Sequence, residues 1–139
     1  MRVLLLGSGG REHALARALA ADPAVTQLHV APGNPGIAAI ATTHAADLAE
    51  PATVVGLARS LAPDLVVVGP EAPLVAGLGD LLRAAGIACF GPGRRAAQIE
   101  GSKSFAKQVM AEAGIPTAHA RTCRTEGEAR AALAEFGPP

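Results

Sequence analysis

The chain has 139 residues, half of them apolar, which is enough for one packed domain or for one domain and part of another. Twelve Lys and Arg balance twelve Asp and Glu, and there are three Phe but no Trp or Tyr. This composition argues against a nucleic-acid surface, which needs an excess of positive charge and aromatic side chains on which bases stack. No apolar run is long enough for a signal peptide or a membrane span.

The two cysteines, Cys89 and Cys123, lie far apart in the sequence and form no C-x-x-C motif. Cys89 stands in an apolar stretch, which is typical of a small core residue. The cysteine pattern therefore predicts a reduced, cytoplasmic protein without a disulfide.

The first predicted strand, Val3–Leu6, is apolar throughout, which is typical of a strand buried on both faces of a parallel sheet. Gly7, Gly9 and Gly10 follow at once, and a helical pattern then begins. Glycines let the backbone approach a ligand, and the free N–H groups and the dipole of a helix start favour an anion. We therefore expect a bound phosphate at this turn; a tight turn without a ligand is the alternative.

The turn Gly7–His13 differs from the dinucleotide-binding pattern G-x-G-x-x-G at its last position, where Glu12 stands. The dinucleotide fold also needs an acidic residue at the end of its second strand, to bind the ribose hydroxyls. The second predicted strand ends with Leu28–Ala31 and has no carboxylate there. Both departures favour the phosphate of a mononucleotide-like ligand over NAD.

Three charged or polar side chains follow the glycines. Arg11 is suited to bidentate contact with a phosphate, and a solvated surface residue is the alternative. Glu12 is not expected to touch a phosphate, because like charges repel, and instead caps the helix or binds a sugar or an amine. His13 is either a ligand or a core residue.

Short strands and amphipathic helices alternate through the rest of the first hundred residues. Strands are predicted at Thr26–Val30, Thr42–Ala45, Leu65–Val68 and Ile87–Phe90, and helices at Arg11–Ala21, Pro51–Ala62 and Leu74–Ala85. This alternation predicts an α/β fold, in which residues 1–100 form a Rossmann-like parallel sheet with helices on both faces.

Ligands of such sheets bind beyond the carboxyl ends of the strands. The loops Gly7–Arg11, Pro32–Gly36 and Gly69–Pro73 fall at that edge and consist of Gly, Pro and single polar residues, which predicts a shaped small-molecule site. Asn34 suits a sugar hydroxyl or a phosphate, or serves the turn alone. Glu71 stands in a loop with two prolines, and we expect it to accept hydrogen bonds from ribose hydroxyls or an amine.

The pattern changes after about residue 100. A helix is predicted from a Ser102 cap to Ala113, a strand at Thr117–Thr122, and another helix after the capping box Thr125–Glu128. One strand and two helices make a poor separate core, so residues 101–139 are interpreted as the incomplete start of a second domain. Lys103 lies at a helix start, where a cation is mildly unfavourable, so it is a candidate anion ligand; a solvated lysine is the alternative.

Catalytic and metal-binding motifs are missing from the sequence. There is no nucleophile–base arrangement, H-E-x-x-H motif, zinc-type Cys and His spacing, Walker A loop or carboxylate pair placed for Mg²⁺. No catalytic residue and no metal ligand are therefore predicted in this chain.

Five motifs occur in a specific order, although each one alone is weak. They are Gly7–Ala14, Pro32–Gly36, Gly69–Leu74, Phe90–Pro92 and Glu100–Lys107. With these motifs in this order, the chain resembles the N-terminal portion of the phosphoribosylamine–glycine ligase (glycinamide ribonucleotide synthetase) family over its whole length.

The resemblance implies an ATP-grasp ligase of de novo purine biosynthesis. In that family ATP converts glycine to glycyl phosphate, and the amine of phosphoribosylamine displaces the phosphate, with Mg²⁺ or Mn²⁺ stabilising the charge on the nucleotide phosphates. By the same resemblance, Gly9, Gly10 and Arg11 would face the 5′-phosphate of the substrate, Asn34 and Glu71 its ribose or amine, and Lys103 the ATP. Gly36 would also belong to the substrate site.

Family members are much longer, so we expect this chain to lack most of the ATP-grasp domain and to be inactive by itself. We expect no nucleic-acid or membrane partner, and we make no prediction of oligomeric state. One alternative is a stand-alone nucleotide-binding Rossmann module, and another is the N domain of a different ATP-grasp carboxylase or transformylase. The loops Pro32–Gly36 and Gly69–Leu74 favour the ligase.

Overall fold

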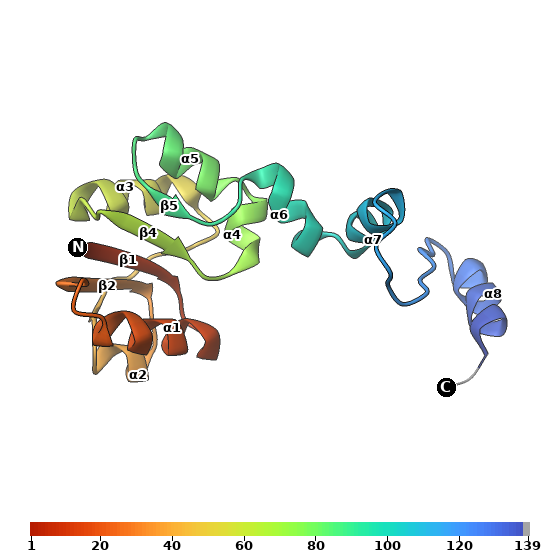
Figure 1. Ribbon diagram of the computed structural model, residues 1–139, viewed down its shortest axis with the longest axis horizontal. Coiled ribbons are helices and arrows are strands. Elements are labelled where there is room, and N and C mark those ends of the chain that lie inside the picture. The colour runs from red at the N-terminus through yellow and green to blue at the C-terminus, as the bar shows by residue number, and fades with distance from the viewer. Residues whose placement is uncertain (138–139) are drawn as a thin grey trace. The chain divides into compact units, whose positions relative to one another are not determined.

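The computed structural model describes residues 1–137, which divide into two compact units, residues 1–101 and 102–137. The first unit contains one five-stranded sheet (Figure 1). Its strands are β1 (Arg2–Gly7), β2 (Gln27–Pro32), β3 (Thr42–Thr43), β4 (Leu65–Val68) and β5 (Cys89–Phe90). All neighbours pair in parallel in the order β3-β2-β1-β4-β5, which confirms the predicted α/β fold.

Strand β1 is the centre of the sheet, and its side chains alternate between two hydrophobic clusters. Val3 and Leu5 belong to one cluster, and Leu4 and Leu6 belong to the other; all four are fully buried. Successive residues of a strand point to opposite faces, so a continuous apolar run needs cover on both faces. This explains why the run contains no polar residue.

Helices cover both faces of this sheet (Figure 1). On one face, α1 (Gly10–Ala21) and α2 (Pro35–Ala38) add Ala16 and Ile37 to the cluster of Val3 and Leu5. The other face is covered by α3 (Pro51–Leu61), α4 (Glu71–Val75), α5 (Leu78–Ala84) and α6 (Arg94–Gly101). The two-sided cover predicted from the alternation of elements is therefore confirmed.

One helical prediction for the first unit is wrong in part, and helix α6 was missed. The single helix predicted at Leu74–Ala85 is two helices, α4 and α5, because Gly77 between them has φ of 98°, a left-handed conformation that glycine adopts without a steric cost. Helix α6 begins where the backbone N–H of Arg94 donates to Asp80 Oδ2 at 2.8 Å, a contact between residues fourteen positions apart.

The second unit contains α7 (Lys103–Glu112) and α8 (Glu126–Phe136). The predicted capping box is confirmed: Thr125 Oγ1 accepts from Glu128 N, and Glu128 Oε2 accepts from Thr125 N, both at 3.2 Å. The strand predicted at Thr117–Thr122 is wrong, since residues 115–123 are irregular. A strand needs a neighbour for its N–H and C=O groups, and the described part of this unit contains no strand to pair with. None of the helices within residues 1–137 is long and apolar enough to cross a membrane.

A histidine pair on the β2–β3 side of the sheet predicts a pH dependence of stability. His29 Nδ1 and His44 Nε2 are 3.0 Å apart, and burial, followed by the charges of His44 and Arg2, lowers the pKa of His29. Unfolding restores the ordinary pKa of about 6.5, so the unfolded chain binds more protons below that pH. Stability is therefore full above about pH 6.5 and falls as the pH drops from there through the lowered pKa of folded His29.

We expect His29→Gln to flatten this part of the pH profile, because the variant lacks the group whose lowered pKa produces the slope. The measurement is the free energy of unfolding in urea between pH 5.5 and 7.5. His119→Gln, at an exposed site of the second unit, is the matched control and should leave the profile unchanged. Equal slopes in the wild type and His29→Gln would contradict the prediction.

Candidate functional site

The predicted ligand-binding edge of the sheet is formed by the loops that follow β1, β2 and β4. Because these strands are parallel neighbours, their carboxyl ends meet at one edge. The N–H groups of Gly33 and Gly69 donate to Gly7 O and Leu6 O at 3.1 and 3.0 Å, which ties the three loops together. The strand order reverses at β1, and this is the place where open α/β sheets bind ligands.

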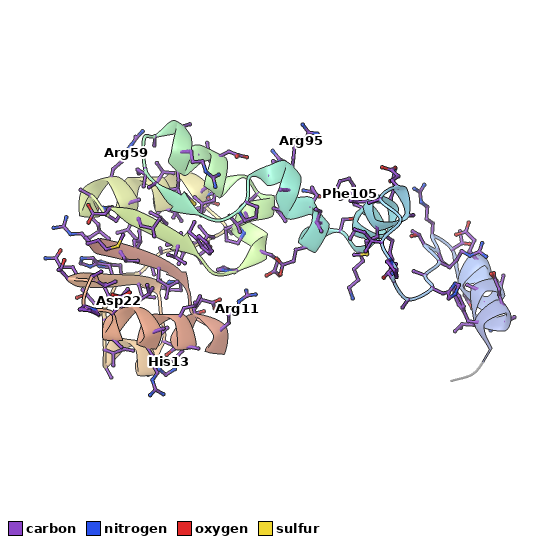
Figure 2. The ribbon with its side chains drawn as sticks, in the orientation of Figure 1. Arg11, His13, Asp22, Arg59, Arg95 and Phe105 are labelled. Carbon is purple, nitrogen blue, oxygen red and sulfur yellow. The ribbon has the colours of Figure 1, made fainter. Side chains whose placement is uncertain are left out.

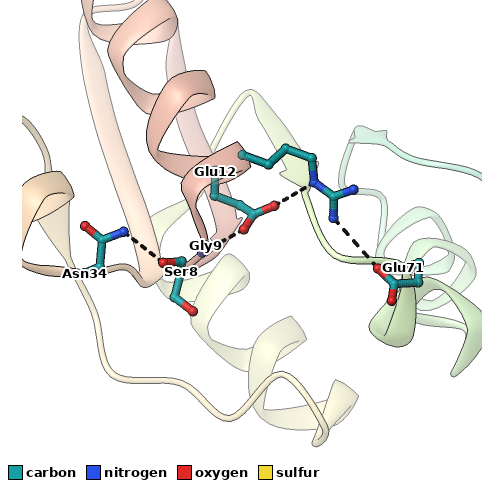
Figure 3. Close-up of polar contacts among 6 residues, drawn as sticks. Ser8, Gly9, Glu12, Asn34 and Glu71 are labelled. Atoms are coloured by element: carbon teal, nitrogen blue, oxygen red, sulfur yellow. Dashed lines mark hydrogen bonds and ion pairs between the residues drawn. The ribbon is translucent and has the colours of Figure 1, made fainter.

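The start of α1 is occupied by a carboxylate of the chain itself. Glu12 Oε2 accepts the N–H of Gly9 at 2.8 Å, and the residue is only 5% exposed (Figure 3). This confirms the capping interpretation of Glu12. The N–H groups of Gly10 and Arg11 belong to the first helical turn, where no acceptor within the helix is available to them.

The glycines of this edge make room for Glu12. A Cβ atom on Gly69 would lie 2.5 Å from Glu12 Cγ, and one on Gly9 would lie 2.9 Å from Glu12 Oε2. A Cβ on Gly7 would also collide with Glu12 Cγ, whereas one on Gly10 would meet open space. Gly7 and Gly69 are therefore required by a buried side chain, a reason that is independent of any ligand.

Arg11 lies at the same edge (Figure 2), between the carboxylates of Glu12 and Glu71. Its Nε donates to Glu12 Oε1 at 3.1 Å, and its Nη2 lies 3.7 Å from Glu71 Oε2. The hydrogen bond and the charge of Glu12 raise the pKa of Arg11, with smaller contributions from Glu100 and Glu71. Since 57% of the Arg11 side chain is exposed, the guanidinium is accessible to an anion.

Asn34 holds the β2 loop in place. Its Oδ1 accepts from Ile37 N at 3.0 Å and caps α2, and its Nδ2 donates to Ser8 O at 2.8 Å (Figure 3). Gly36, in the first turn of α2, packs against the ring of His13: a Cβ there would lie 2.5 Å from His13 Cε1. Part of the predicted turn Pro32–Gly36 is thus helical, and half-buried His13 packs between α1 and α2.

Glu71 is the first residue of α4, so the predicted loop Gly69–Pro73 is helical over its last three residues. The Glu71 side chain is 47% exposed and points toward Arg11 (Figure 3). The structure therefore brings together Gly9, Gly10, Arg11 and Glu71 from loops about sixty residues apart.

A groove of about 450 Å³ adjoins this edge. Apart from the polar side chains of Ser8 and Glu12, the groove is lined by glycine and by apolar residues. The lining residues are Gly7, Ser8, Glu12, Leu48, Ala49, Pro70, Ala72, Pro73 and Ala76. Sequence analysis missed the wall formed by Leu48 and Ala49, because these residues precede α3 and carry no motif. Only the fold brings them to the strand ends.

Lys103 lies in the second unit, as the first residue of α7, and is exposed. The Ser102 cap predicted for this helix is confirmed, with Ser102 Oγ accepting from Phe105 N at 3.3 Å. Lys107, by contrast, donates to Thr117 Oγ1 at 2.7 Å and holds the segment that follows the helix. Within residues 1–137 no three His, Cys, Asp or Glu side chains gather closely enough to hold a metal ion.

Comparison with known proteins identifies the family to which the chain belongs. The family model for the phosphoribosylglycinamide synthetase N domain matches residues 1–100. The chain belongs to the phosphoribosylglycinamide synthetase N-domain family. It is 58% identical over its whole length to phosphoribosylamine–glycine ligase of Streptomyces coelicolor and 57% identical to that of Mycobacterium tuberculosis. In both comparisons the chain spans about a third (33%) of the relative's length.

Solved structures place the synthetase N domain in a wider fold group. Phosphoribosylamine–glycine ligase of Thermotoga maritima matches all of this chain and 32% of its own, with 31% identity and a TM-score of 0.72. N5-carboxyaminoimidazole ribonucleotide synthetase of Thermus thermophilus matches 99% of this chain and 37% of its own, with 17% identity and a TM-score of 0.73. The second likeness shows a shared fold only.

Proposed function

We propose that this chain is the N-terminal part of a phosphoribosylamine–glycine ligase. The enzyme would join glycine to 5-phosphoribosylamine through glycyl phosphate, forming glycinamide ribonucleotide, ADP and phosphate in purine biosynthesis. The observation that carries the proposal is the 58% identity over the full 139 residues to a ligase of that name. Carboxylases and transformylases are the alternative ATP-grasp enzymes. The transformylase and the carboxylase compared with this chain are 24% and 19% identical to it, so those likenesses show the fold alone.

Within the ligase, we assign the first unit to the phosphoribosyl substrate. Arg11 presents an exposed guanidinium for the 5′-phosphate, together with the first-turn N–H groups near Gly9 and Gly10. Glu71, 3.7 Å from Arg11, is placed to accept from a ribose hydroxyl or the amine. Asn34, beside Gly36, keeps one lone pair and one N–H for a ribose hydroxyl.

We assign the nucleotide to the other part of the enzyme. Residues 101–139 would begin the ATP-grasp region, with Lys103 as an ATP contact, and Mg²⁺ or Mn²⁺ would neutralise the phosphates. The residues described here do not fit a metal site, so the metal ligands would come from the two thirds of the relatives that this chain does not span. The proposed compartment is the cytoplasm, where the free thiols of Cys89 and Cys123 stay reduced.

The stand-alone nucleotide-binding module, with NAD as its ligand, is disfavoured by the end of β2. In the dinucleotide fold an acidic residue at that position binds the ribose hydroxyls. Strand β2 ends with Val30, Ala31 and Pro32 and carries no carboxylate. The turn after β1 also departs from G-x-G-x-x-G at Glu12, whose carboxylate accepts the Gly9 N–H.

A chimera tests the proposed enzyme. The first 139 residues of the Streptomyces coelicolor ligase would be replaced by this chain, and ADP release would be assayed with glycine and phosphoribosylamine. We expect activity within about tenfold of the parent enzyme. A folded chimera without substrate-dependent ADP release would contradict the proposal.

Glu71→Gln is expected to weaken binding of ribose 5-phosphate by the 139-residue chain about three- to tenfold, because an amide accepts hydrogen bonds less strongly than a carboxylate. Isothermal titration calorimetry measures the Kd, and the urea midpoint should stay constant because Glu71 is exposed. Glu112→Gln, an exposed carboxylate of the second unit, is the control for net charge. An unchanged Kd in Glu71→Gln would show that Glu71 does not bind the ligand and has only a structural role at the start of α4.

A further inference from the structure

Glu12 is a buried carboxylate that the proposed reaction does not use. It lies between the ends of β1 and β4, where the backbones of Gly7 and Gly69 approach it too closely for any Cβ atom. A charge at such a site is retained only when hydrogen bonds and opposite charge compensate for its lost hydration. The partners of its two oxygens therefore indicate what it does.

Each oxygen of Glu12 has a separate partner. Oε2 accepts the Gly9 N–H at 2.8 Å and anchors the carboxylate to the backbone, and Oε1 accepts Arg11 Nε at 3.1 Å. The contact uses Nε, so Glu12 engages neither Nη group of Arg11, and the Arg11 side chain as a whole is 57% exposed. Glu71 is too far from Nη2, at 3.7 Å, for a hydrogen bond.

We propose that Glu12 is a positioning residue: its buried carboxylate holds Arg11 so that the Nη groups are presented to the phosphate of a sugar-phosphate ligand. An arginine that is 57% exposed would otherwise sample many rotamers and lose that freedom on binding. A fixed fork binds a phosphate with less loss of entropy. This role rests on the proposed function, because it takes Arg11 as the phosphate ligand.

Glu12→Gln separates the positioning role from a structural one. The Gln carbonyl oxygen can still accept the Gly9 N–H, but its NH₂ group cannot accept from Arg11 Nε. The substitution removes negative charge beside the site, so charge alone would strengthen phosphate binding. Loss of positioning predicts the opposite sign, which a merely electrostatic role would not produce. A merely structural role would weaken binding in the Arg11→Ala background as well, whereas a role that acts through Arg11 would not.

The test measures the Kd of ribose 5-phosphate for the 139-residue chain by calorimetry in the wild type, Glu12→Gln, Arg11→Ala and the double variant. We expect Glu12→Gln to bind about three- to tenfold more weakly than the wild type. We expect it to cause no further loss in the Arg11→Ala background, because its effect acts through Arg11. Glu112→Gln serves as the control for net charge and should leave the Kd unchanged.

A second measurement is independent of the ligand. The ¹⁵N signal of Arg11 Nε should report an ordered side chain in the wild type and a mobile one in Glu12→Gln. A mobile Arg11 in the wild type would overturn the positioning role whether or not ribose 5-phosphate binds, and so would an unchanged or tighter Kd in Glu12→Gln. Failure of the wild type to bind ribose 5-phosphate, with an ordered Arg11, would instead contradict the proposed function on which this role depends.

Discussion

Gly69→Ala is expected to lower the free energy of unfolding by about 2–3 kcal/mol, because the new methyl group overpacks a filled crevice and forces Glu12 from its hydrogen bonds. A Cβ on Gly69 would lie 2.5 Å from both Cγ and Oε1 of Glu12. The φ of Gly69 is not in the left-handed region, so the effect is steric and not conformational. Urea unfolding of the wild type and the variant measures the difference.

Two further variants show whether Glu12 is the cause. Glu12→Ala removes the side chain that the methyl group would strike, so Gly69→Ala should cost less in that background than in the wild type. Gly56→Ala is the matched control: Gly56 lies inside α3, where a Cβ meets nothing within 4 Å, so the change should stabilise the helix by about 0.5–1 kcal/mol. A cost of Gly69→Ala below about 0.5 kcal/mol would contradict the steric account.

Leu82→Ala is expected to lower the free energy of unfolding by about 2–5 kcal/mol, the range for truncating a fully buried leucine. Leu82 is 0% exposed and packs from α5 into the cluster that contains Leu4 and Leu6. The substitution loses the transfer free energy of the side chain and leaves a cavity that the surrounding residues fill only partly.

Leu81→Ala is the control for helix propensity and composition, since it makes the same chemical change one position earlier in α5. Leu81 is 47% exposed, so folding buries less of its apolar surface than it buries of Leu82. We therefore expect the free energy of unfolding to fall by less than about 1 kcal/mol. The two urea midpoints measured in the same buffer test the difference. Equal losses of unfolding free energy in the two variants would contradict the burial of Leu82 and the exposure of Leu81.

The buried strands at the centre of the sheet were predictable because their signal is local, whereas the strand predicted at Thr117–Thr122 was wrong. Leu65–Val68 was predicted with the bounds that the structure has, since four apolar residues between polar turns leave few alternatives. Helix faces were less predictable in an alanine-rich chain. In α1 the leucine Leu15 is 38% exposed, whereas Glu12 and Ala16 are the buried residues. The buried face of such a helix is hard to predict, because alanine occurs on all of its faces and gives no clear apolar stripe.

The candidate site was predictable in its location and not in its chemistry. A Gly-rich turn after a buried strand has the same signature whether it receives a phosphate or a carboxylate of the chain itself, because both need close backbone approach and a free N–H. Likewise, Asn34 between prolines and glycines suited a ligand or a turn. Its bond to Ser8 O is visible only when the two loops are adjacent.

From the amino-acid sequence alone came the parallel sheet with two covered faces, the edge that carries the site and the resemblance to a ligase family, because apolar runs and ordered motifs are properties of neighbouring residues. The tertiary structure alone decided that Glu12 fills the crevice between β1 and β4 and that Arg11 lies between Glu12 and Glu71. The physical reason is distance along the chain: Gly69 and Glu71 reach Glu12 and Arg11 across nearly sixty residues, only after β4 has paired with β1.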